Sequence, residues 1–203
     1  MGEAVAMGGR PEEVRAPEAW LTEVERERAD RFRFEADRSS FVAAHLLVRL
    51  CAADLLGADP AGLTLLQHCD VHGPGHGRPY LAEEPHIGVS LSHTRGYVCA
   101  AAGPGRVGVD AERVPEGPLD RALAERALTA GERARVTGNR ELIRLWARKE
   151  ALIKRGELTM DSMGAREPDW DELHLVEWEE PPDVVVTAIT DVPIRRRPIP
   201  RIG

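Results

Sequence analysis

The chain of 203 residues is poor in aromatic residues, in cysteines and in long apolar stretches. Its three cysteines, Cys51, Cys69 and Cys99, are too few and too scattered for a disulfide framework. No run of about 18 apolar residues, the length that a membrane span needs, occurs in the sequence, and its first residues lack the apolar segment of a signal peptide. We therefore expect a reduced, soluble, cytoplasmic protein with an aliphatic core.

The charge balance argues against another broad class of protein. The formal net charge is −7, whereas a general nucleic-acid binder needs a basic surface. Hydrophobic residues make up 42% and charged residues 30%, as in ordinary globular domains. We expect neither nucleic acid nor membrane among the partners, although a local basic pocket for a small polyphosphate is compatible with this charge.

The pattern of apolar residues predicts an α+β fold. Two strong helices are expected over residues 37–56 and 139–155, each followed by a glycine that is typical of a helix end. The other expected elements are strands within 86–114, 172–180 and 183–190, helical sequence over 119–136, and an irregular loop over 67–81.

We expect this chain to consist of a tail and two halves. Residues 1–16 predict a loose N-terminal tail. Residues 17–104 and 105–203 are expected to form two halves joined near Gly103-Pro104-Gly105. A strand-plus-helix theme occurs in both halves, without a visible repeat in residue identity.

Asp110 and Glu112 stand two residues apart in VGVDAERV, so their side chains would share one face of a strand. Two neighbouring carboxylates repel each other unless a cation lies between them. Mg²⁺ favours such oxygen ligands together with water and phosphate oxygens. The alternative is an exposed strand face with two acids that bind nothing.

Glu150 falls on the apolar face of the helix over 139–155, close to Trp146. A carboxylate in apolar surroundings is costly unless it is paired or bound to a metal. A metal site shared with Asp110 and Glu112 would supply that partner. Pairing with Lys154, four residues further on, is the structural alternative.

Three residues at turns are candidates for phosphate binding. Ser92 and His93 lie at the end of an expected strand, and Arg78 lies in the turn Gly77-Arg78-Pro79. Hydroxyl, imidazole and guanidinium groups can all donate to phosphate oxygens. Local hydrogen bonds within the turn are the alternative for Ser92 and His93.

The first long helix carries Arg38, His45 and Arg49 on one face. This face is either a solvated surface or an anion-binding surface.

A zinc site is a further possibility in the loop over 67–81. Cys69 and His72 have the spacing of a half-site, with His68 and His76 nearby, but no second well-spaced pair follows. A glycine-rich loop that faces a substrate is the favoured interpretation.

Together these residues resemble the surfactin-type 4′-phosphopantetheinyl transferases. The signatures of that family are a Gly-x-Asp-x-Glu strand and a Trp-x-x-Lys-Glu-x-x-x-Lys helix. They stand here as Gly108-Val109-Asp110-Ala111-Glu112 and Trp146-Ala147-Arg148-Lys149-Glu150-Ala151-Leu152-Ile153-Lys154. Similar segments at 31–50, 76–81, 90–94 and 129–136 extend the resemblance over most of the chain.

The resemblance implies a pseudo-dimer of two similar α+β halves, with the active site between them. It implies that Asp110, Glu112 and Glu150 bind Mg²⁺, or Mn²⁺, and that Glu150, Lys154 and Asp110 are catalytic. The N-terminal half would bind coenzyme A and the C-terminal half would hold the metal. The residues implied in coenzyme A binding are Arg38, Arg49, Arg78, Ser92, His93 and Lys154, with His45 as a weaker candidate.

The implied activity is transfer of phosphopantetheine from coenzyme A to a serine of an apo acyl or peptidyl carrier protein by a monomeric enzyme. Adenosine 3′,5′-bisphosphate would leave, and Glu150 would take the serine proton. The alternative is a non-catalytic coenzyme A or nucleotide-binding module of the same fold.

Lys149 and Glu132 match the family pattern without a role that the sequence explains. After Lys154 this chain has Arg155-Gly156-Glu157-Leu158, where the family has a longer loop ending in Gly-x-Gly-Leu.

Overall fold

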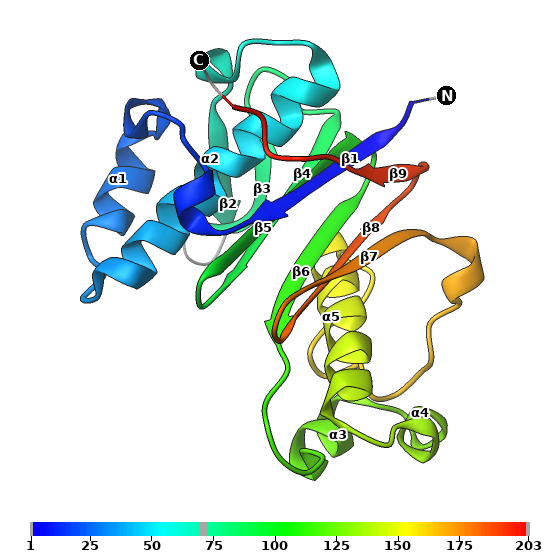
Figure 1. Ribbon diagram of the computed structural model, residues 1–203. Helices are drawn as coiled ribbons and strands as arrows, with labels where there is room; N and C mark the ends of the chain where they lie inside the picture. Colours follow the sequence, from blue (N-terminus) through cyan, green and yellow to red (C-terminus); the bar gives the residue numbers. More distant parts are fainter. Residues whose placement is uncertain (1, 70–72, 202–203) are drawn as a thin grey trace.

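Two β-sheets organise the chain in the computed structural model, which describes residues 2–69 and 73–201 (Figure 1). The larger sheet has the strand order β2-β3-β4-β5-β1-β9, and the smaller sheet has the order β6-β8-β7. The strands are Ala4–Gly9 (β1), Leu65–Cys69 (β2), Gly73–Leu81 (β3), Ile87–Thr94 (β4), Tyr97–Pro104 (β5), Val107–Arg113 (β6), His174–Glu180 (β7), Val184–Thr190 (β8) and Ile194–Arg196 (β9).

Each sheet is covered by one long helix. The helices are Glu23–Ala29 (α1), Glu35–Leu56 (α2), Arg121–Ala127 (α3), Ala130–Arg135 (α4) and Asn139–Arg155 (α5). Helix α2 packs against β1, β4 and β5 of the larger sheet, and α5 packs against β6 and β8 of the smaller one (Figure 1). The predicted α+β class is confirmed.

Helix α2 is the core helix of the larger sheet. Every residue from 40 to 53 is buried, because the sheet and the N-terminal segments surround it. Its mean hydropathy of 1.5 would suit a membrane span, but 78% of the apolar stretch is buried inside the fold, as in the core helix of a globular domain. Gly57, with a φ of 63°, ends the helix in the left-handed conformation, as its position predicted.

The N-terminal segment contains a buried strand of the larger sheet. β1 pairs antiparallel with β5 and parallel with β9. Val5 and Met7 join the apolar cluster around α2, whereas Ala6 joins the cluster between the two sheets. The prediction of a loose tail over residues 1–16 is therefore wrong. A strand buried on both faces shows no polar alternation, and these small residues gave no strand signal.

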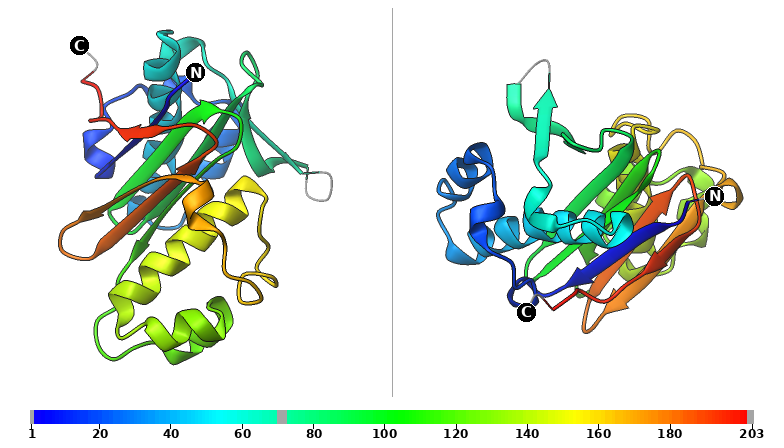
Figure 2. Two further views of the ribbon diagram at one scale, coloured as in Figure 1. Left: turned by 90° about the vertical axis from the view of Figure 1, so that its right-hand side faces the viewer. Right: turned by 90° about the horizontal axis from the view of Figure 1, so that it is seen from above.

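The end of the chain returns to the larger sheet. β9 lies beside β1, so the C-terminal and N-terminal strands are neighbours (Figure 2). The boundary expected at residues 104 and 105 does separate β5 from β6. Residues 105–203 nevertheless do not form a self-contained half, because residues 194–196 pair with the first strand of the chain.

Two local predictions also differ from the structure. Residues 67–81, expected to be irregular, contribute to a hairpin of β2 and β3 whose register shifts between Gln67 and His68. The helical sequence over 119–136 is split into α3 and α4, because Thr129 and Glu132 form a capping box that starts a new helix.

The two sheets meet across a buried apolar cluster. Within it, Trp178 Nε1 of β7 donates to the hydroxyl of Tyr97 of β5 at 2.7 Å. We call this contact between the two sheets the seam. Along the seam, the backbone N–H of Val109 in β6 donates to Ser90 Oγ in β4 at 3.1 Å. The seam thereby fixes β4 against β6 and, through β6, against α5.

Candidate active site at the seam of the sheets

Strand β6 and helix α5 approach so closely that only glycine fits at position 108. A Cβ atom there would collide with the carbonyl oxygen of Ala151 on α5. Asp110 lies two residues further along β6, and Lys154 lies about one turn further along α5. The glycine of the first sequence motif therefore permits the contact between the acid of that motif and the lysine of the second.

Asp110 is the most buried acid of the site, with 4% of its surface exposed. Its Oδ1 atom accepts a hydrogen bond from Ser92 Oγ at 2.9 Å and another from Lys154 Nζ at 2.7 Å. Its Oδ2 atom is buried and has no hydrogen-bond partner. One carboxylate oxygen is therefore satisfied and the other is not, which is a costly arrangement for a buried charge.

Lys154 uses all three of its ammonium donors on the protein. Besides Asp110, Nζ donates to the carbonyl oxygens of Val109 at 2.9 Å and Leu91 at 3.3 Å. The side chain is 29% exposed, so it still borders solvent. Lys154 thus ties β4 to β6, and it would have to exchange one of these bonds to donate to a phosphate.

Glu112 and Glu150 lie within electrostatic range of Asp110. The pKa of each is raised, first because burial removes water from the carboxylate and second because Asp110 is negatively charged. Trp146 Nε1 donates to Glu112 Oε1 at 3.2 Å, which opposes the shift of Glu112. The sequence prediction that these three acids converge is consistent with these mutual effects.

The acids approach one another without reaching ligand spacing. Across residues 2–69 and 73–201, no group of three or more His, Cys, Asp or Glu side chains has the spacing needed to hold a metal ion. The donor set nevertheless fits a hard divalent cation, because Asp110 Oδ2 is buried without a partner and the three carboxylates repel one another. Asp110, Glu112 and Glu150 are therefore the residues that could hold one.

A pocket of about 380 Å³ opens beside Lys154. This volume is in the range of small-molecule sites. Arg78 lines the pocket, and its guanidinium lies against Gly156 at the end of α5, where a Cβ atom would collide with it. The remaining lining residues are Gln67, Gly77, Pro79, Ser90, Leu91 and Ile153.

His93 lies next to this region at the end of β4, and its side chain is exposed. Its pKa is lowered, first because neighbouring protein displaces water and second because the Lys154 charge is close. A neutral imidazole is therefore favoured at neutral pH, and it can donate one hydrogen bond to a phosphate oxygen. Ser92, in contrast, already donates its hydroxyl proton to Asp110.

The structure removes Arg49 and His45 from the candidate site. Arg49 is fully buried and forms an ion pair with Glu25 at 2.6 Å, and it also donates to the carbonyl oxygens of Leu63 and His45. His45 is buried, and desolvation lowers its pKa to about 4. The prediction that Arg49 binds coenzyme A is therefore wrong, because this part of the core helix α2 is buried and Arg49 has no contact with solvent.

Arg38 is accessible but occupied. It makes a two-point hydrogen-bonded pair with Glu18, at 3.1 and 2.8 Å, near the start of α2. No contact joins Arg38 to the acids or to the pocket beside Lys154 among the interactions of the described residues. Its predicted role toward a nucleotide stays a prediction.

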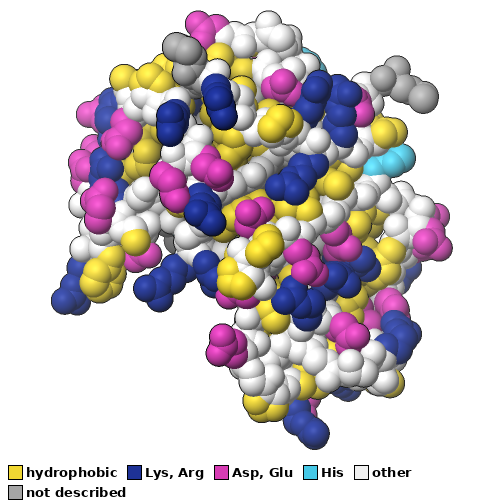
Figure 3. Space-filling model, viewed as in Figure 1, with side chains coloured by type: hydrophobic (Ala, Val, Ile, Leu, Met, Phe, Trp, Pro, Cys, Tyr) yellow, Lys and Arg dark blue, Asp and Glu magenta, His cyan; other side chains and the backbone are white. Residues whose placement is uncertain are grey.

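The surface shows a notch between the two lobes of the molecule (Figure 3). Lys and Arg side chains gather along its upper edge, although the net charge of the chain is −7. Local positive charge of this kind on an acidic protein attracts anionic ligands.

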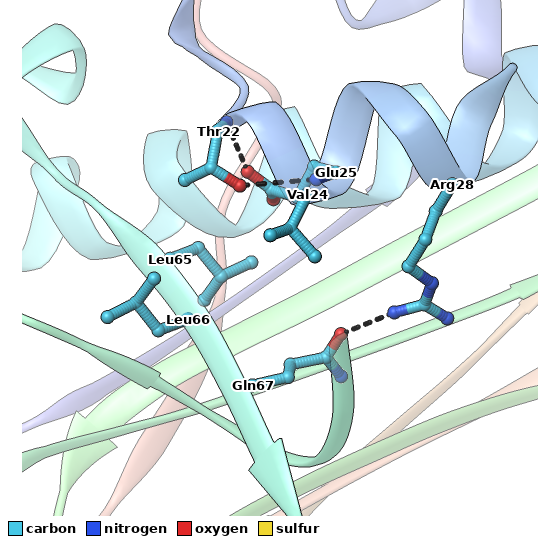
Figure 4. A pocket seen from close by; sticks show the side chains of 7 residues that line it. All are labelled: Thr22, Val24, Glu25, Arg28, Leu65, Leu66 and Gln67. Atoms are coloured by element: carbon cyan, nitrogen blue, oxygen red, sulfur yellow. Dashed lines mark hydrogen bonds between the residues drawn. The ribbon is translucent and has the colours of Figure 1, made fainter. Parts of the chain in front are cut away.

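A second, much smaller pocket lies between α1 and β2 (Figure 4). Its volume of about 40 Å³ accommodates a water molecule or two and excludes a nucleotide. Arg28 Nη1 donates to Gln67 Oε1 at 2.9 Å at its edge. Gln67 also lines the larger pocket, so this bond fixes one wall of it.

Lys149 and Glu132, for which the sequence suggested no role, form a pair in the structure. Lys149 Nζ contacts Glu132 Oε2 at 2.5 Å, and it also donates to the carbonyl oxygens of Ala127 at 2.9 Å and Met163 at 2.7 Å. Both charged side chains are fully buried. The pair therefore anchors α5 to α4 and to the segment around residue 163, one residue away from Glu150.

Arg126 is a functional candidate that the sequence analysis missed. This exposed residue of α3 has its guanidinium carbon 6.0 Å from the ring centre of Trp146, and its charge lowers the pKa of Glu150. Helical periodicity could not reveal it, because the partner ring lies on another helix.

Part of the zinc alternative lies outside the described residues. His72 belongs to the segment 70–72, and the side chains of Cys69 and His76 are not described either. His68 is exposed in β2.

Comparison with known proteins identifies a similar family. The family model of the 4′-phosphopantetheinyl transferase superfamily matches residues 106–195. The matched segment contains β6 and α5, and with them Asp110, Glu112, Glu150 and Lys154.

Curated relatives carry the same name. A 4′-phosphopantetheinyl transferase of Bacillus subtilis is 26% identical over 155 residues, which cover 71% of this chain and 65% of the relative. A phosphopantetheinyl transferase of a Thraustochytrium species is 32% identical over 158 residues, 68% of this chain and 52% of the relative. The 4′-phosphopantetheinyl transferase psf-1 of Bacillus pumilus is 27% identical over 132 residues, 62% and 53% of the two chains. The chain thus spans between about half and two thirds of these relatives.

Proposed function

We propose that this chain is a 4′-phosphopantetheinyl transferase of the surfactin type, which moves phosphopantetheine from coenzyme A to a serine of an apo acyl or peptidyl carrier protein. The observation that carries the proposal is the meeting of Asp110 from β6 with Lys154 from α5 and Ser92 from β4 at the seam of the sheets. The similarity to phosphopantetheinyl transferases over residues 106–195 supports it.

Asp110, Glu112 and Glu150 would hold Mg²⁺, with Mn²⁺ as a substitute. A divalent cation bound there would offset negative charge on the pyrophosphate as its bond breaks. Asp110 offers its unpartnered Oδ2 atom, and Trp146 orients Glu112 through its indole N–H.

Coenzyme A would lie in the pocket beside Lys154, with its phosphates toward the acids. Arg78 and the neutral imidazole of His93 are the donors with free capacity there, whereas Ser92 acts mainly by orienting Asp110. Lys154 can contribute a donor to the pyrophosphate by releasing the carbonyl of Leu91, its longest bond at 3.3 Å. The two sheets, each with one long helix, are consistent with a pseudo-dimer whose ligand lies between the halves.

The transfer is a displacement at the β-phosphorus of coenzyme A. The carrier serine loses its proton to Glu150, directly or through a water molecule, and the serine oxygen forms the new bond to phosphorus. The bond to the α-phosphate oxygen breaks, and adenosine 3′,5′-bisphosphate leaves with both electrons of that bond. In the metal-free protein, burial and the charge of Asp110 raise the pKa of Glu150, which favours proton uptake by this carboxylate. We further propose that the enzyme is monomeric and cytoplasmic, where coenzyme A and carrier proteins are present.

Mass spectrometry of apo carrier proteins tests this function. After incubation with coenzyme A and Mg²⁺, a carrier should gain one phosphopantetheine with the wild type and with the control variant Glu12→Ala, an exposed acid of the N-terminal segment. Asp110→Ala and Glu150→Ala should give no transfer. Binding of coenzyme A without a mass change in any of several carriers would instead support the non-catalytic binding module.

A further inference from the structure

We propose that Lys154 is an internal cation that competes with the divalent metal for Asp110 and thereby keeps the metal affinity of the free enzyme low. The inference rests on the proposed function, because it concerns the same acids. Its starting point is that Lys154 Nζ already occupies the cationic position at Asp110 Oδ1, at 2.7 Å.

The hydrogen bonds of Lys154 hold its ammonium where it would compete with a metal for Asp110. Its three donors are taken by Asp110, by the carbonyl of Val109 and by the carbonyl of Leu91, so the ammonium is held in place from three sides. An ammonium held by these three bonds stays beside the Asp110 carboxylate as long as β4 and β6 keep their contact. It cannot turn away to solvent without leaving two backbone oxygens unsatisfied.

The two carboxylate oxygens of Asp110 would bind two different cations. Oδ1 receives Lys154 and Ser92, and the buried Oδ2 has no partner, so a metal would bind at Oδ2. Both oxygens belong to one carboxyl group, and the metal therefore comes to lie close to the ammonium. Like charges at this distance repel, and the repulsion is strengthened because Asp110 is buried, with 4% of its surface exposed.

The arrival of coenzyme A changes this balance. A pyrophosphate in the pocket beside Lys154 could accept a donor from its ammonium, and the negative charge of the pyrophosphate would then offset the repulsion between the ammonium and a bound metal. Metal binding should therefore tighten when coenzyme A is present, and by linkage coenzyme A should bind more tightly when metal is present. Removal of the lysine charge should tighten metal binding in the free enzyme and weaken this coupling.

Direct measurement of Mn²⁺ binding tests the inference without the transfer reaction. The signal of free Mn²⁺ in electron paramagnetic resonance gives the dissociation constant for wild type, Lys154→Met and Lys154→Gln, each with and without coenzyme A. We expect Mn²⁺ to bind at least about tenfold more tightly to the two variants than to wild type in the absence of coenzyme A. The control Arg144→Met removes one positive charge from the exposed face of the same helix, where it pairs with Glu179, and should leave the affinity unchanged.

Two results would overturn the inference, and they are distinguishable. If Asp110→Asn abolishes Mn²⁺ binding while both Lys154 variants bind Mn²⁺ as weakly as wild type, the metal site stands and Lys154 is not a competitor. If no variant binds Mn²⁺, the inference fails together with the proposed metal site. Thermal denaturation with and without Mn²⁺ shows that each variant is folded, and Mn²⁺ should raise the melting temperature of Lys154→Met more than that of wild type.

Discussion

Lys149 and Glu132 form an ion pair of 2.5 Å in the interior of the protein, one residue from the proposed general base Glu150. Removal of one partner leaves the other charge buried without compensation, at a cost of about 3 to 5 kcal/mol. We therefore expect Glu132→Leu and Lys149→Met each to lower the free energy of unfolding by that amount, as measured by urea denaturation.

The double variant separates the pair from its surroundings. Glu132→Leu combined with Lys149→Met replaces both charges by apolar groups and should be more stable than either single variant. Losses that add up in the double variant would contradict the idea that the two residues act as a pair.

Gly108 sets the distance between β6 and α5. We expect Gly108→Ala to lower the free energy of unfolding by about 1 to 3 kcal/mol, because the added methyl group collides with the carbonyl of Ala151. Transfer activity should also fall under conditions in which the variant is fully folded. The displacement of α5 away from β6 would separate Lys154 from Asp110. Gly62→Ala is the matched control, because a Cβ atom at position 62 meets no atom within 4 Å. Equal behaviour of the two variants in denaturation would refute this role of Gly108.

The raised pKa of Glu150 makes the metal-free protein less stable at neutral pH. A carboxyl group whose pKa is raised in the folded state favours folding at low pH, and this contribution is lost as the pH rises through the folded-state pKa. Glu150→Gln, which stays neutral, should therefore exceed wild type in stability at about pH 7 in the presence of a chelator, with the difference disappearing in acid.

Glu141 is an exposed glutamate whose pKa is shifted in the opposite direction, so it serves as a control for Glu150. Backbone and side-chain hydrogen bonds from Thr137 lower the pKa of Glu141, so its contribution is present at neutral pH and lost in acid. Glu141→Gln should therefore be less stable than wild type at neutral pH. A lower stability of Glu150→Gln under the same conditions would show that burial and repulsion do not dominate at Glu150.

Arg126 adjusts the protonation of the proposed base. Its positive charge lowers the pKa of Glu150, so Arg126→Ala should raise that pKa. The pH at which transfer activity rises to half its maximum should then move upward, measured as kcat/KM over a range of pH. Arg121→Ala removes an exposed arginine from the same helix and should leave the profile in place. An unchanged profile for both variants would exclude an effect of Arg126 on the base.

Arg78 and Arg49 should respond to substitution in opposite ways. Arg78→Ala is expected to raise KM for coenzyme A about tenfold with little loss of stability, because the side chain is exposed beside the pocket. Arg49→Ala should instead lower the free energy of unfolding by about 3 to 5 kcal/mol, because it leaves Glu25 unpaired in the core. Steady-state kinetics and urea denaturation distinguish the two, and an altered KM in a fully stable Arg49→Ala variant would contradict the structure.

The sequence predicted the elements whose pattern is local. Helices α2 and α5 follow from continuous or periodic apolar residues, with a glycine just after the last residue of each helix, and they were found close to their predicted bounds. Asp110 and Glu112 were placed correctly on a strand, because a spacing of two residues fixes a common face.

The sequence could not predict features that depend on distant partners. β1 consists mostly of small apolar residues, and only pairing with β5, almost a hundred residues later, makes it a strand. Arg49 looked like a surface cation because its partner Glu25 lies on another helix. All three ammonium donors of Lys154 are occupied because two backbone carbonyls, from β4 and β6, accept hydrogen bonds from it. A motif of side chains cannot predict such backbone partners.

A crystal structure with Mn²⁺ and coenzyme A tests the central claim most directly, because Mn²⁺ can be located by its anomalous scattering. We predict a single Mn²⁺ peak at the seam of the sheets, within about 2.2 Å of carboxylate oxygens of Asp110, Glu112 and Glu150 and bridged to the pyrophosphate. A peak bound elsewhere, with Asp110 still paired only to Lys154 and Ser92, would contradict the account.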